Sequence, residues 1–322
     1  MDYENYMELY ETVYFFNKMN CSVDHTVPKL ISLEEAERLG IHESIYQAVM
    51  RILVASRLLE YDGNCFVMTN EQMEKYRYIL DNLIHKDPYK QYPELYNKAM
   101  NESQFFFDNM SASEYEIYSR CNYPISFQIG NEIVNHVNLG KSKVLELGGN
   151  SGGLATALLT KNQDCDYTVV DTKIPCRVGN EFKKLNGLKI RFMEENIFNL
   201  ELSGEVYDYI ILMNLLHDFD DPKCLDILYN CIKYCGSGTK FLIIEDVLSG
   251  EFEPKEVIMH GLRLSVECRG GRQRTFKELE SLFSSINYRL EKTLKINNIH
   301  SMLVMESREV KDGVGGKVCS GI

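Results

Sequence analysis

From about residue 141 onward, short apolar runs alternate with longer amphipathic segments along the chain. A short apolar run predicts a strand, and a segment with apolar positions three and four residues apart predicts a helix. The runs that predict strands cover residues 143–147, 167–171, 189–193, 207–213 and 240–246, with a closing hairpin at 288–294 and 300–305. Strands that alternate with helices are typical of an α/β fold with a doubly wound parallel sheet.

The first 70 residues carry a different pattern. Apolar and aromatic positions at helical spacing predict a helix over residues 1–20. Ser32-Leu-Glu-Glu35 is a capping box that opens a short helix ending at Gly40, and a second helix covers about 44–58. The Asp62-Gly63 turn then separates two short apolar stretches and predicts a hairpin. Two helices followed by a hairpin predict a winged helix.

Charge argues against nucleic acid as the partner of this winged helix. Residues 1–70 hold five Lys or Arg against eleven Asp or Glu, and the whole chain has a net charge of −12. The second helix would enter the major groove, but it offers only Arg51 and Arg57 for phosphate contacts. We therefore predict that this module forms a homodimer and that nucleic acid is not a partner.

The 322 residues predict two domains and a tail. The expected divisions are a mainly helical winged-helix domain with linking helices over 1–105, a sheet domain over 106–306, and a disordered, Gly-rich tail over 307–322. No apolar run approaches the roughly 18 residues that span a bilayer, and the N-terminus lacks the features of a signal peptide. Ten cysteines without a Cys-x-x-Cys pair suit reduced thiols. These features predict a cytoplasmic protein without a membrane partner.

The first strand of the sheet ends in a glycine-rich turn that contains Glu146, Gly148, Gly149, Asn150 and Gly152. A strand, a glycine turn and a helix bring a ligand close to bare backbone. The spacing is neither the G-x-G-x-x-G of a dinucleotide site nor a phosphate loop, which needs Gly-Lys-Ser/Thr. An acid at Glu146 suits a ligand with positive charge and would repel a pyrophosphate.

Polar side chains follow the next strands at the same edge of the predicted sheet, where open parallel sheets bind ligands. Asp171 comes about 20 residues after the turn and is placed to accept hydrogen bonds from ribose hydroxyls; the alternative role is a helix N-cap. Asn196 follows the third strand and is placed to meet an adenine amino group. Met213 ends the fourth strand. These residues predict a nucleoside site.

His217 directly follows the fourth strand and precedes three acids. Imidazole has an ordinary pKa near neutrality, which suits it to take a proton from a hydroxyl group. The fifth strand ends in Glu245, which can lie beside His217, fix its tautomer and stabilise the imidazolium. The alternative role for Glu245 is to cap the following loop.

Over about residues 10–306, the chain resembles the small-molecule O-methyltransferases typified by plant caffeate and flavonoid, vertebrate acetylserotonin and bacterial polyketide enzymes. The family's glycine motif corresponds to 147–152 and its ribose carboxylate to Asp171. Its Leu-His-Asp-Trp-x-Asp motif corresponds to 216–221, with Phe219 in place of Trp. The resemblance implies a class I methyltransferase fold, S-adenosylmethionine (SAM) as cofactor, and His217 as the general base.

Two further positions depart from the family pattern. The family's Gly-Gly-x-Glu-Arg-Thr motif is present as Gly270-Gly-Arg-Gln-Arg-Thr275, so Gln273 replaces an acid. Gln can orient the imidazole but cannot balance its charge. Asn196 stands where the family has an adenine-contacting Asp. The resemblance implies that Glu245 and Gln273 support His217, and it implies no metal.

The resulting hypothesis is methyl transfer from SAM to an oxygen of a small molecule, as in secondary metabolism. Residues 97–100 and 102–107 supply bulky apolar groups suited to an acceptor pocket. One alternative keeps the fold but methylates carbon or nitrogen, with iron held by His217, Asp218 and His260. Another is a non-enzymatic regulator that senses a metabolite.

Overall fold

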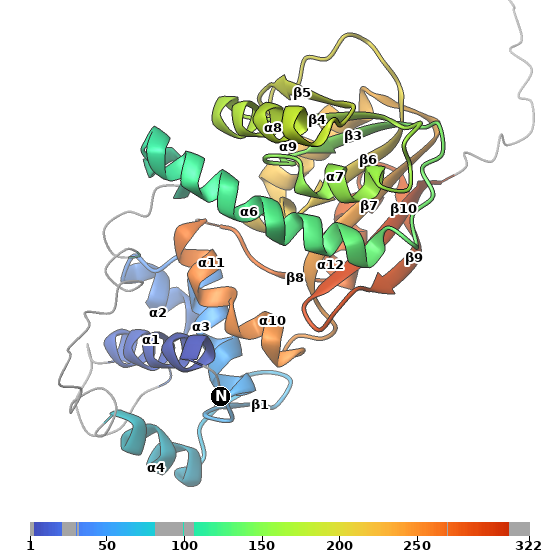
Figure 1. Ribbon diagram of the computed structural model, residues 1–322. Coiled ribbons are helices and arrows are strands. Elements are labelled where there is room, and N and C mark those ends of the chain that lie inside the picture. Colours follow the sequence, from blue (N-terminus) through green and yellow to red (C-terminus); the bar gives the residue numbers. More distant parts are fainter. Residues whose placement is uncertain are drawn as a thin grey trace, which may run out of the picture.

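The larger part of the molecule is built around a sheet in the order β5–β4–β3–β6–β7–β10–β9, with β8 paired to the end of β7 (Figure 1). The computed structural model describes residues 3–20, 30, 32–80, 99, 106–268 and 270–308. The strands are β3 (Lys143–Leu147), β4 (Asp166–Asp171), β5 (Ile190–Glu194), β6 (Tyr207–Met213), β7 (Cys235–Leu248), β8 (Arg274–Thr275), β9 (Tyr288–Lys295) and β10 (His300–Ser307). Neighbours from β5 to β7 are parallel, while β10 and β9 are antiparallel. The predicted doubly wound α/β sheet with its closing hairpin is confirmed.

Helices cover both faces of the sheet. They are α6 (Ala112–Ile133), α7 (Gly153–Leu159), α8 (Lys173–Asn186), α9 (Asp221–Ile232) and α12 (Phe276–Ser284). Buried residues of α6 and α7 form one apolar cluster with Val144 and Ile211 of the sheet. Buried residues of α9 and α12 form another cluster with Leu145 and Ile210, which are adjacent to Val144 and Ile211 on the same strands and face the other side of the sheet. Parallel strands are buried on both faces, which is why they read as continuous apolar runs.

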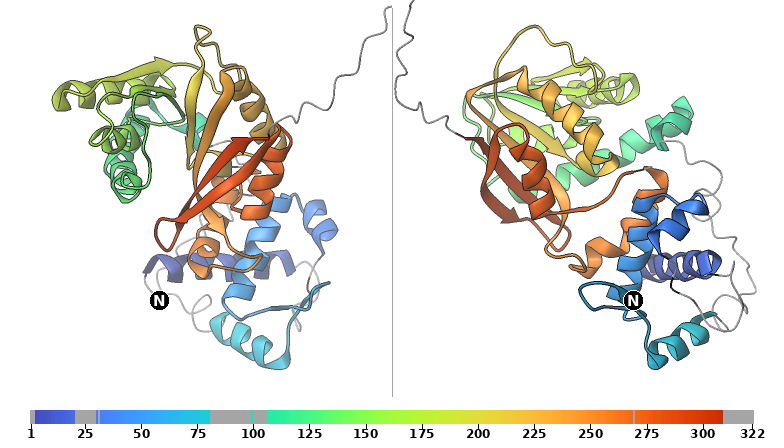
Figure 2. Two further views of the ribbon diagram at one scale, coloured as in Figure 1. Left: turned by 90° about the vertical axis from the view of Figure 1, so that its right-hand side faces the viewer. Right: turned by 180° about the vertical axis from the view of Figure 1, so that it is seen from behind.

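A second layer, made mainly of helices, lies beside one end of the sheet, and Figure 2 shows it from two further sides. It contains α1 (Tyr3–Asn20), α2 (Leu33–Arg38), α3 (Glu43–Ala55), β1 (Glu60–Tyr61), β2 (Phe66–Val67), α4 (Asn70–Ile79), α10 (Lys255–Met259) and α11 (Gly261–Glu267). Although α10 and α11 follow β7 in the chain, they pack on α3. Ile52 and Leu53 of α3 share one buried apolar cluster with Ile258 and Leu262. This core therefore joins segments about 200 residues apart.

The predicted elements are confirmed with small shifts at their ends. The helix–helix–hairpin order is present, including the capping box at Ser32, and β3 and β6 have the predicted bounds. β7 begins at Cys235, earlier than the predicted 240, and the two-residue β8 was not predicted. Ser307, predicted as the start of the tail, is the last residue of β10. Residues 309–322 lie outside the described part of the chain.

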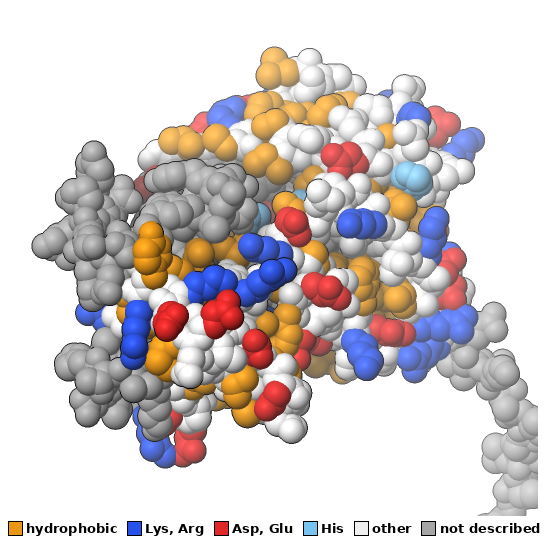
Figure 3. Space-filling model, turned by 90° about the horizontal axis from the view of Figure 1, so that it is seen from below, with side chains coloured by type: hydrophobic (Ala, Val, Ile, Leu, Met, Phe, Trp, Pro, Cys, Tyr) orange, Lys and Arg blue, Asp and Glu red, His pale blue; other side chains and the backbone are white. Residues whose placement is uncertain are grey.

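Acidic and basic side chains are mixed over the face shown in Figure 3, which includes the mainly helical layer. Within the described ranges, no helix has the length and apolar character needed to cross a membrane. The two-domain division itself stays a prediction, because α10 and α11 bring later parts of the chain into the N-terminal apolar core.

Candidate active site

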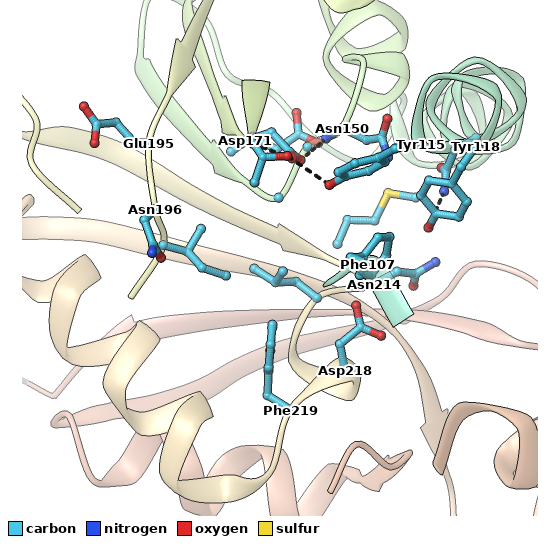
Figure 4. A pocket seen from close by; sticks show the side chains of 18 of the residues that line it. Phe107, Tyr115, Tyr118, Asn150, Asp171, Glu195, Asn196, Asn214, Asp218 and Phe219 are labelled. Atoms are coloured by element: carbon cyan, nitrogen blue, oxygen red, sulfur yellow. Dashed lines mark hydrogen bonds between the residues drawn. The ribbon is translucent and has the colours of Figure 1, made fainter. Parts of the chain in front are cut away.

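A cavity of about 910 Å³ opens at the carboxyl ends of β3, β4 and β6. β4 and β6 lie on opposite sides of β3, so this is the switch point of the sheet, where open α/β sheets bind ligands. Helix α6 and the short 3-10 helices η2 (Phe106–Asn109) and η3 (Leu216–Asp218) complete its wall (Figure 4). The volume suits a nucleoside-sized ligand together with a small second molecule.

The glycine turn after β3 forms one wall of the cavity. Gly148 has a φ of +65°, which favours glycine, and its N–H donates to the Val170 carbonyl at 2.8 Å. A Cβ on Gly148 would lie 2.7 Å from Leu215, and one on Gly149 would lie 2.6 Å from the carboxyl carbon of Glu146. The turn therefore presents bare backbone to the cavity, as predicted.

Glu146 is buried at the end of β3 and accepts a hydrogen bond from the Tyr167 hydroxyl at 2.9 Å. Burial raises the pKa of this carboxyl to about 8, although the Tyr167 hydrogen bond lowers it. Glu146 is therefore mostly protonated at neutral pH in the free protein. A cationic ligand in the cavity would favour its ionised form, so the predicted acid–cation contact depends on the ligand.

Asp171, at the end of β4, fixes the glycine turn. Its carboxylate accepts hydrogen bonds from the backbone N–H of Asn150 at 2.8 Å and of Thr172 at 2.7 Å. Burial raises the pKa of Asp171 to about 6 against the lowering effect of these bonds. The N-cap of α8 is Thr172, so the helix-cap alternative does not describe Asp171. Acceptor capacity remains on the carboxylate for ligand hydroxyls.

Asn150 and Gly152 have different places in the turn. Asn150 has a φ of +50° and lines the cavity. Gly152 has a φ of +79° and is not among the lining residues; a Cβ there would meet the Phe192 ring at 2.7 Å. The structure thus places Gly152 in the packing between the turn and β5, where the sequence predicted a cofactor contact.

Asn196 and Met213 both line the cavity. The Asn196 Oδ1 accepts a hydrogen bond from the Phe198 N–H at 2.9 Å. The side-chain oxygen, which is the atom that could accept from an adenine amino group, is therefore already engaged by the backbone. The side-chain NH2 group of Asn196 retains two N–H donors for a ligand.

His217 lies in η3 with a carboxylate near each ring nitrogen. Nδ1 is 2.8 Å from Glu245 Oε2, and Nε2 is 3.5 Å from Asp218 Oδ1. Burial alone would lower the pKa of the imidazole, but Glu245, Asp218 and the more distant Asp246 outweigh it and raise the pKa to about 10. The site therefore stabilises a positive charge on His217.

Glu245 lies within β7 and contacts the loop that follows β6, not the loop after its own strand that the alternative role required. Its Oε2 faces the imidazole of His217, while its Oε1 accepts hydrogen bonds from the backbone N–H groups of Leu215 at 3.0 Å and Leu216 at 2.9 Å. Glu245 therefore both supports the histidine and holds the loop on which the histidine lies. Its side chain is 3% exposed, so solvent screens this contact weakly.

The structure does not bring Gln273 close to His217 and its two carboxylates. Gln273 is buried beside α11, where a Cβ on Gly261 would lie 3.3 Å from its Oε1, and it does not line the cavity. Its neighbours hold the histidine loop instead. The backbone N–H of Arg272 donates to the His217 carbonyl at 2.8 Å. The side-chain guanidinium of Arg274 donates to the Leu216 carbonyl at 2.7 Å. Sequence reasoning missed both arginines, although the motif around 270–275 pointed to this segment.

Aromatic side chains from η2 and α6 form the wall opposite the strand ends. Phe107 lies 5.6 Å from Tyr115 and 5.3 Å from Tyr118 between ring centroids, and all three line the cavity. The prediction that residues 102–107 line a pocket is confirmed for Phe107. Residues 97, 98 and 100–105 lie outside the described part of the chain. The two tyrosines were missed because their spacing on α6 also fits ordinary core packing.

The comparisons with known proteins agree with this geometry. The model of the O-methyltransferase domain family matches residues 76–289. The chain belongs to this family. O-methyltransferase 7 of Dictyostelium discoideum is 24% identical over 83% of this chain and 81% of its own length. Acetylserotonin O-methyltransferase of Gallus gallus is 27% identical over 55% of this chain, and the match spans about half (49%) of the chicken enzyme.

Solved structures of O-methyltransferases share the fold. An O-methyltransferase family 2 protein from Planctomyces limnophilus, in complex with apigenin, superposes with a TM-score of 0.74 at 16% identity, covering 96% of this chain and 97% of that one. Human N-acetylserotonin methyltransferase, in complex with SAM, gives 0.59 at 19% identity, covering 95% and 96%. At these identities the likeness establishes the O-methyltransferase fold and not the ligand.

The metal alternative finds no support in the described part of this member of the O-methyltransferase domain family. His260, its third predicted ligand, is exposed at the junction of α10 and α11 and does not line the cavity. Among the described residues, no group of three His, Cys, Asp or Glu side chains is placed to hold an ion.

Proposed function

We propose that this protein transfers a methyl group from SAM to an oxygen of a small molecule, with His217 as the general base. The observation that carries the proposal is the position of His217, flanked by Glu245 and Asp218, in the wall of the cavity that also contains the glycine turn and Asp171. Family membership supports the reaction class.

The residues of the cavity fit the proposed cofactor. Side chains at Gly148 and Gly149 would collide with Leu215 and Glu146, so a ligand meets backbone there. Asp171 retains acceptor capacity for hydroxyl groups, and Glu146 is an acid that a cation would ionise. When bound, SAM supplies a methyl group on a positively charged sulfonium, which is already activated toward a nucleophile.

His217 handles the proton of the acceptor hydroxyl in this proposal. A base must be neutral to accept a proton, while the free site favours the imidazolium. A cationic ligand in the same cavity opposes a second positive charge, so we expect a lower pKa for His217 in the complex than in the free protein. Glu245 then stabilises the imidazolium after proton transfer.

Calorimetry with SAM and S-adenosylhomocysteine tests the cofactor part of the proposal. We expect both to bind, and we expect Asp171→Asn to weaken binding by about 10-fold or more, because the amide replaces one acceptor oxygen with a donor. Asp166→Asn is the matched control, since Asp166 is exposed at the start of the same strand. Failure of both ligands to bind the wild type would overturn the proposal, and binding without turnover of any acceptor would favour the metabolite sensor.

We also propose that the chain forms a homodimer through its N-terminal helices. The helix–helix–hairpin arrangement and the acidic balance of residues 1–70 support a protein partner over DNA. Light scattering should then give twice the chain mass of 37.3 kDa. A mass of one chain at micromolar concentration would contradict the dimer. The cytoplasmic location and a role in secondary metabolism stay predictions.

A further inference from the structure

Asp218 occupies the side of His217 opposite Glu245. Its Oδ1 lies 3.5 Å from His217 Nε2, and its side chain is 14% exposed. Figure 4 shows its carboxyl group directed into the cavity, beneath Phe107 and Asn214. Burial raises the pKa of Asp218, and the charge of His217 opposes this rise. A carboxylate in such a place needs hydrogen-bond donors to stay ionised.

A buried thiol provides that donor. Cys268 Sγ lies 3.2 Å from the same oxygen of Asp218 that faces His217. Within the described ranges, this thiol is the one side chain that donates a hydrogen bond to Asp218. Burial, followed by the charge of Asp218, raises the pKa of Cys268. The thiol therefore keeps its proton and acts as a donor.

Cys268 is also held rigidly. It is 4% exposed and ends α11, where its N–H donates to the Leu264 carbonyl at 2.8 Å. A Cβ on Gly271 would lie 2.7 Å from the Cys268 carbonyl and 2.7 Å from the His217 carbonyl. The backbone after Cys268 thus passes closely over the histidine loop, which fixes the thiol relative to Asp218.

We propose that Cys268 is a positioning residue: its thiol holds Asp218 against His217, and Asp218 balances the charge that the neutral Gln273 cannot. Two observations support the assignment of this role to Asp218 and not to Gln273. Gln273 lies away from the cavity, while Glu245 and Asp218 flank the two ring nitrogens. The catalytic meaning of the arrangement rests on the proposed function, but the link from Cys268 to the proton affinity of His217 does not.

The charges around the pair set the direction of the effect. The negative charges that act on His217 are Glu245 and Asp246 from β7 and Asp218 from its own loop. The negative charge of Glu267 from α11 also acts on Asp218. Loss of the thiol removes a hydrogen bond that favours ionised Asp218. The carboxyl then protonates more readily, and the imidazolium loses part of its support.

The test is an NMR titration of the His217 ring in the purified full chain, with neither methyl donor nor acceptor present. We expect Cys268→Ala to lower the pKa of His217 by roughly 0.5–1 pH unit, because one hydrogen bond to a charged group is lost. Cys268→Ser keeps a donor and should retain the wild-type value. Cys224→Ala is the matched control, since the buried Cys224 thiol contacts the same loop through the Leu216 carbonyl at 3.2 Å.

A double-mutant cycle asks whether Cys268 acts through Asp218. Asp218→Asn should itself lower the pKa of His217, and Cys268→Ala should then cause no further shift. An unchanged pKa in Cys268→Ala, an equal shift in Cys224→Ala, or an undiminished shift in the Asp218→Asn background would each overturn the proposal. Failure of SAM binding would overturn the proposed function and leave this titration unaffected.

Discussion

At the residue scale, the histidine differs from an isolated imidazole because carboxylates surround it. His217 lies against Glu245 and Asp218, with Asp246 further away, and their charges outweigh the effect of burial on its pKa. Sequence position alone predicted the histidine and Glu245, because the apolar runs before them predicted strands ending at one edge of the sheet, although β7 in fact continues past Glu245 to Leu248. It could not predict the pairing of Asp218 with Cys268, because that contact joins residues 50 positions apart through the fold.

The raised pKa of His217 predicts the pH dependence of the reaction. A general base acts in its neutral form, so kcat/KM measured with SAM and acceptor both far below saturation should rise with pH. It should level off above the pKa of His217 in the free protein, which lies well above the ordinary value of about 6.5. The measurement needs an acceptor hydroxyl that does not ionise between pH 6 and 10. In His217→Ala this rising limb should disappear. A plateau that already begins near pH 7 in the wild type would contradict the account.

At the element scale, short connections after the strands position the site. The glycine turn after β3 and the η3 loop after β6 contact each other through Gly148 and Leu215. Arg274 holds the η3 loop: its buried guanidinium donates hydrogen bonds to the Leu216 and Phe219 carbonyls. The Gly-Gly-Arg-Gln-Arg-Thr segment indicated that this region matters. The fold shows that its arginines, and not Gln273, contact the histidine loop.

Gly148→Ala should weaken SAM binding by about 10-fold or more, because the new Cβ displaces Leu215 toward the cavity. The same substitution at Gly187 is the matched control. Both glycines have a φ of +65°, but a Cβ on Gly187 meets no atom within 4 Å. Both variants should lose roughly 1–2 kcal/mol of stability from backbone strain, and calorimetry should separate them. Equal SAM affinity in the two variants would show that the turn does not contact the cofactor.

Arg274→Met should destabilise the protein by roughly 2–4 kcal/mol, because two buried carbonyls lose their donors. Arg289→Met is the control: Arg289 pairs with Glu306 on the surface, where its side chain is 58% exposed, and its loss should cost less than about 1 kcal/mol. Urea unfolding of the two variants measures both values. Similar costs would mean that Arg274 does not hold the histidine loop.

At the scale of the whole molecule, features that follow from local sequence patterns could be predicted, and features that depend on long-range packing could not. The strands and the three N-terminal helices could be predicted, because their apolar spacing lies in continuous stretches of sequence. The packing of α10 and α11 on α3 could not, because Leu262 and Ile258 have the same apolar character whichever core they join. The aromatic wall of Tyr115 and Tyr118 was missed for the same reason. The wall of the cavity formed by the strand ends was therefore easier to predict than the aromatic wall from η2 and α6.

We propose above all that this protein transfers the methyl group of SAM to an oxygen of a small molecule. The most direct measurement uses SAM labelled with ¹³C at its methyl group and a panel of small hydroxyl-bearing acceptors, with the product methyl group identified by its carbon chemical shift. The account predicts an O-methyl product from the wild type, and a loss of about 100-fold or more in rate for His217→Ala with SAM affinity retained. A label on carbon or nitrogen, or an undiminished rate in His217→Ala, would contradict it.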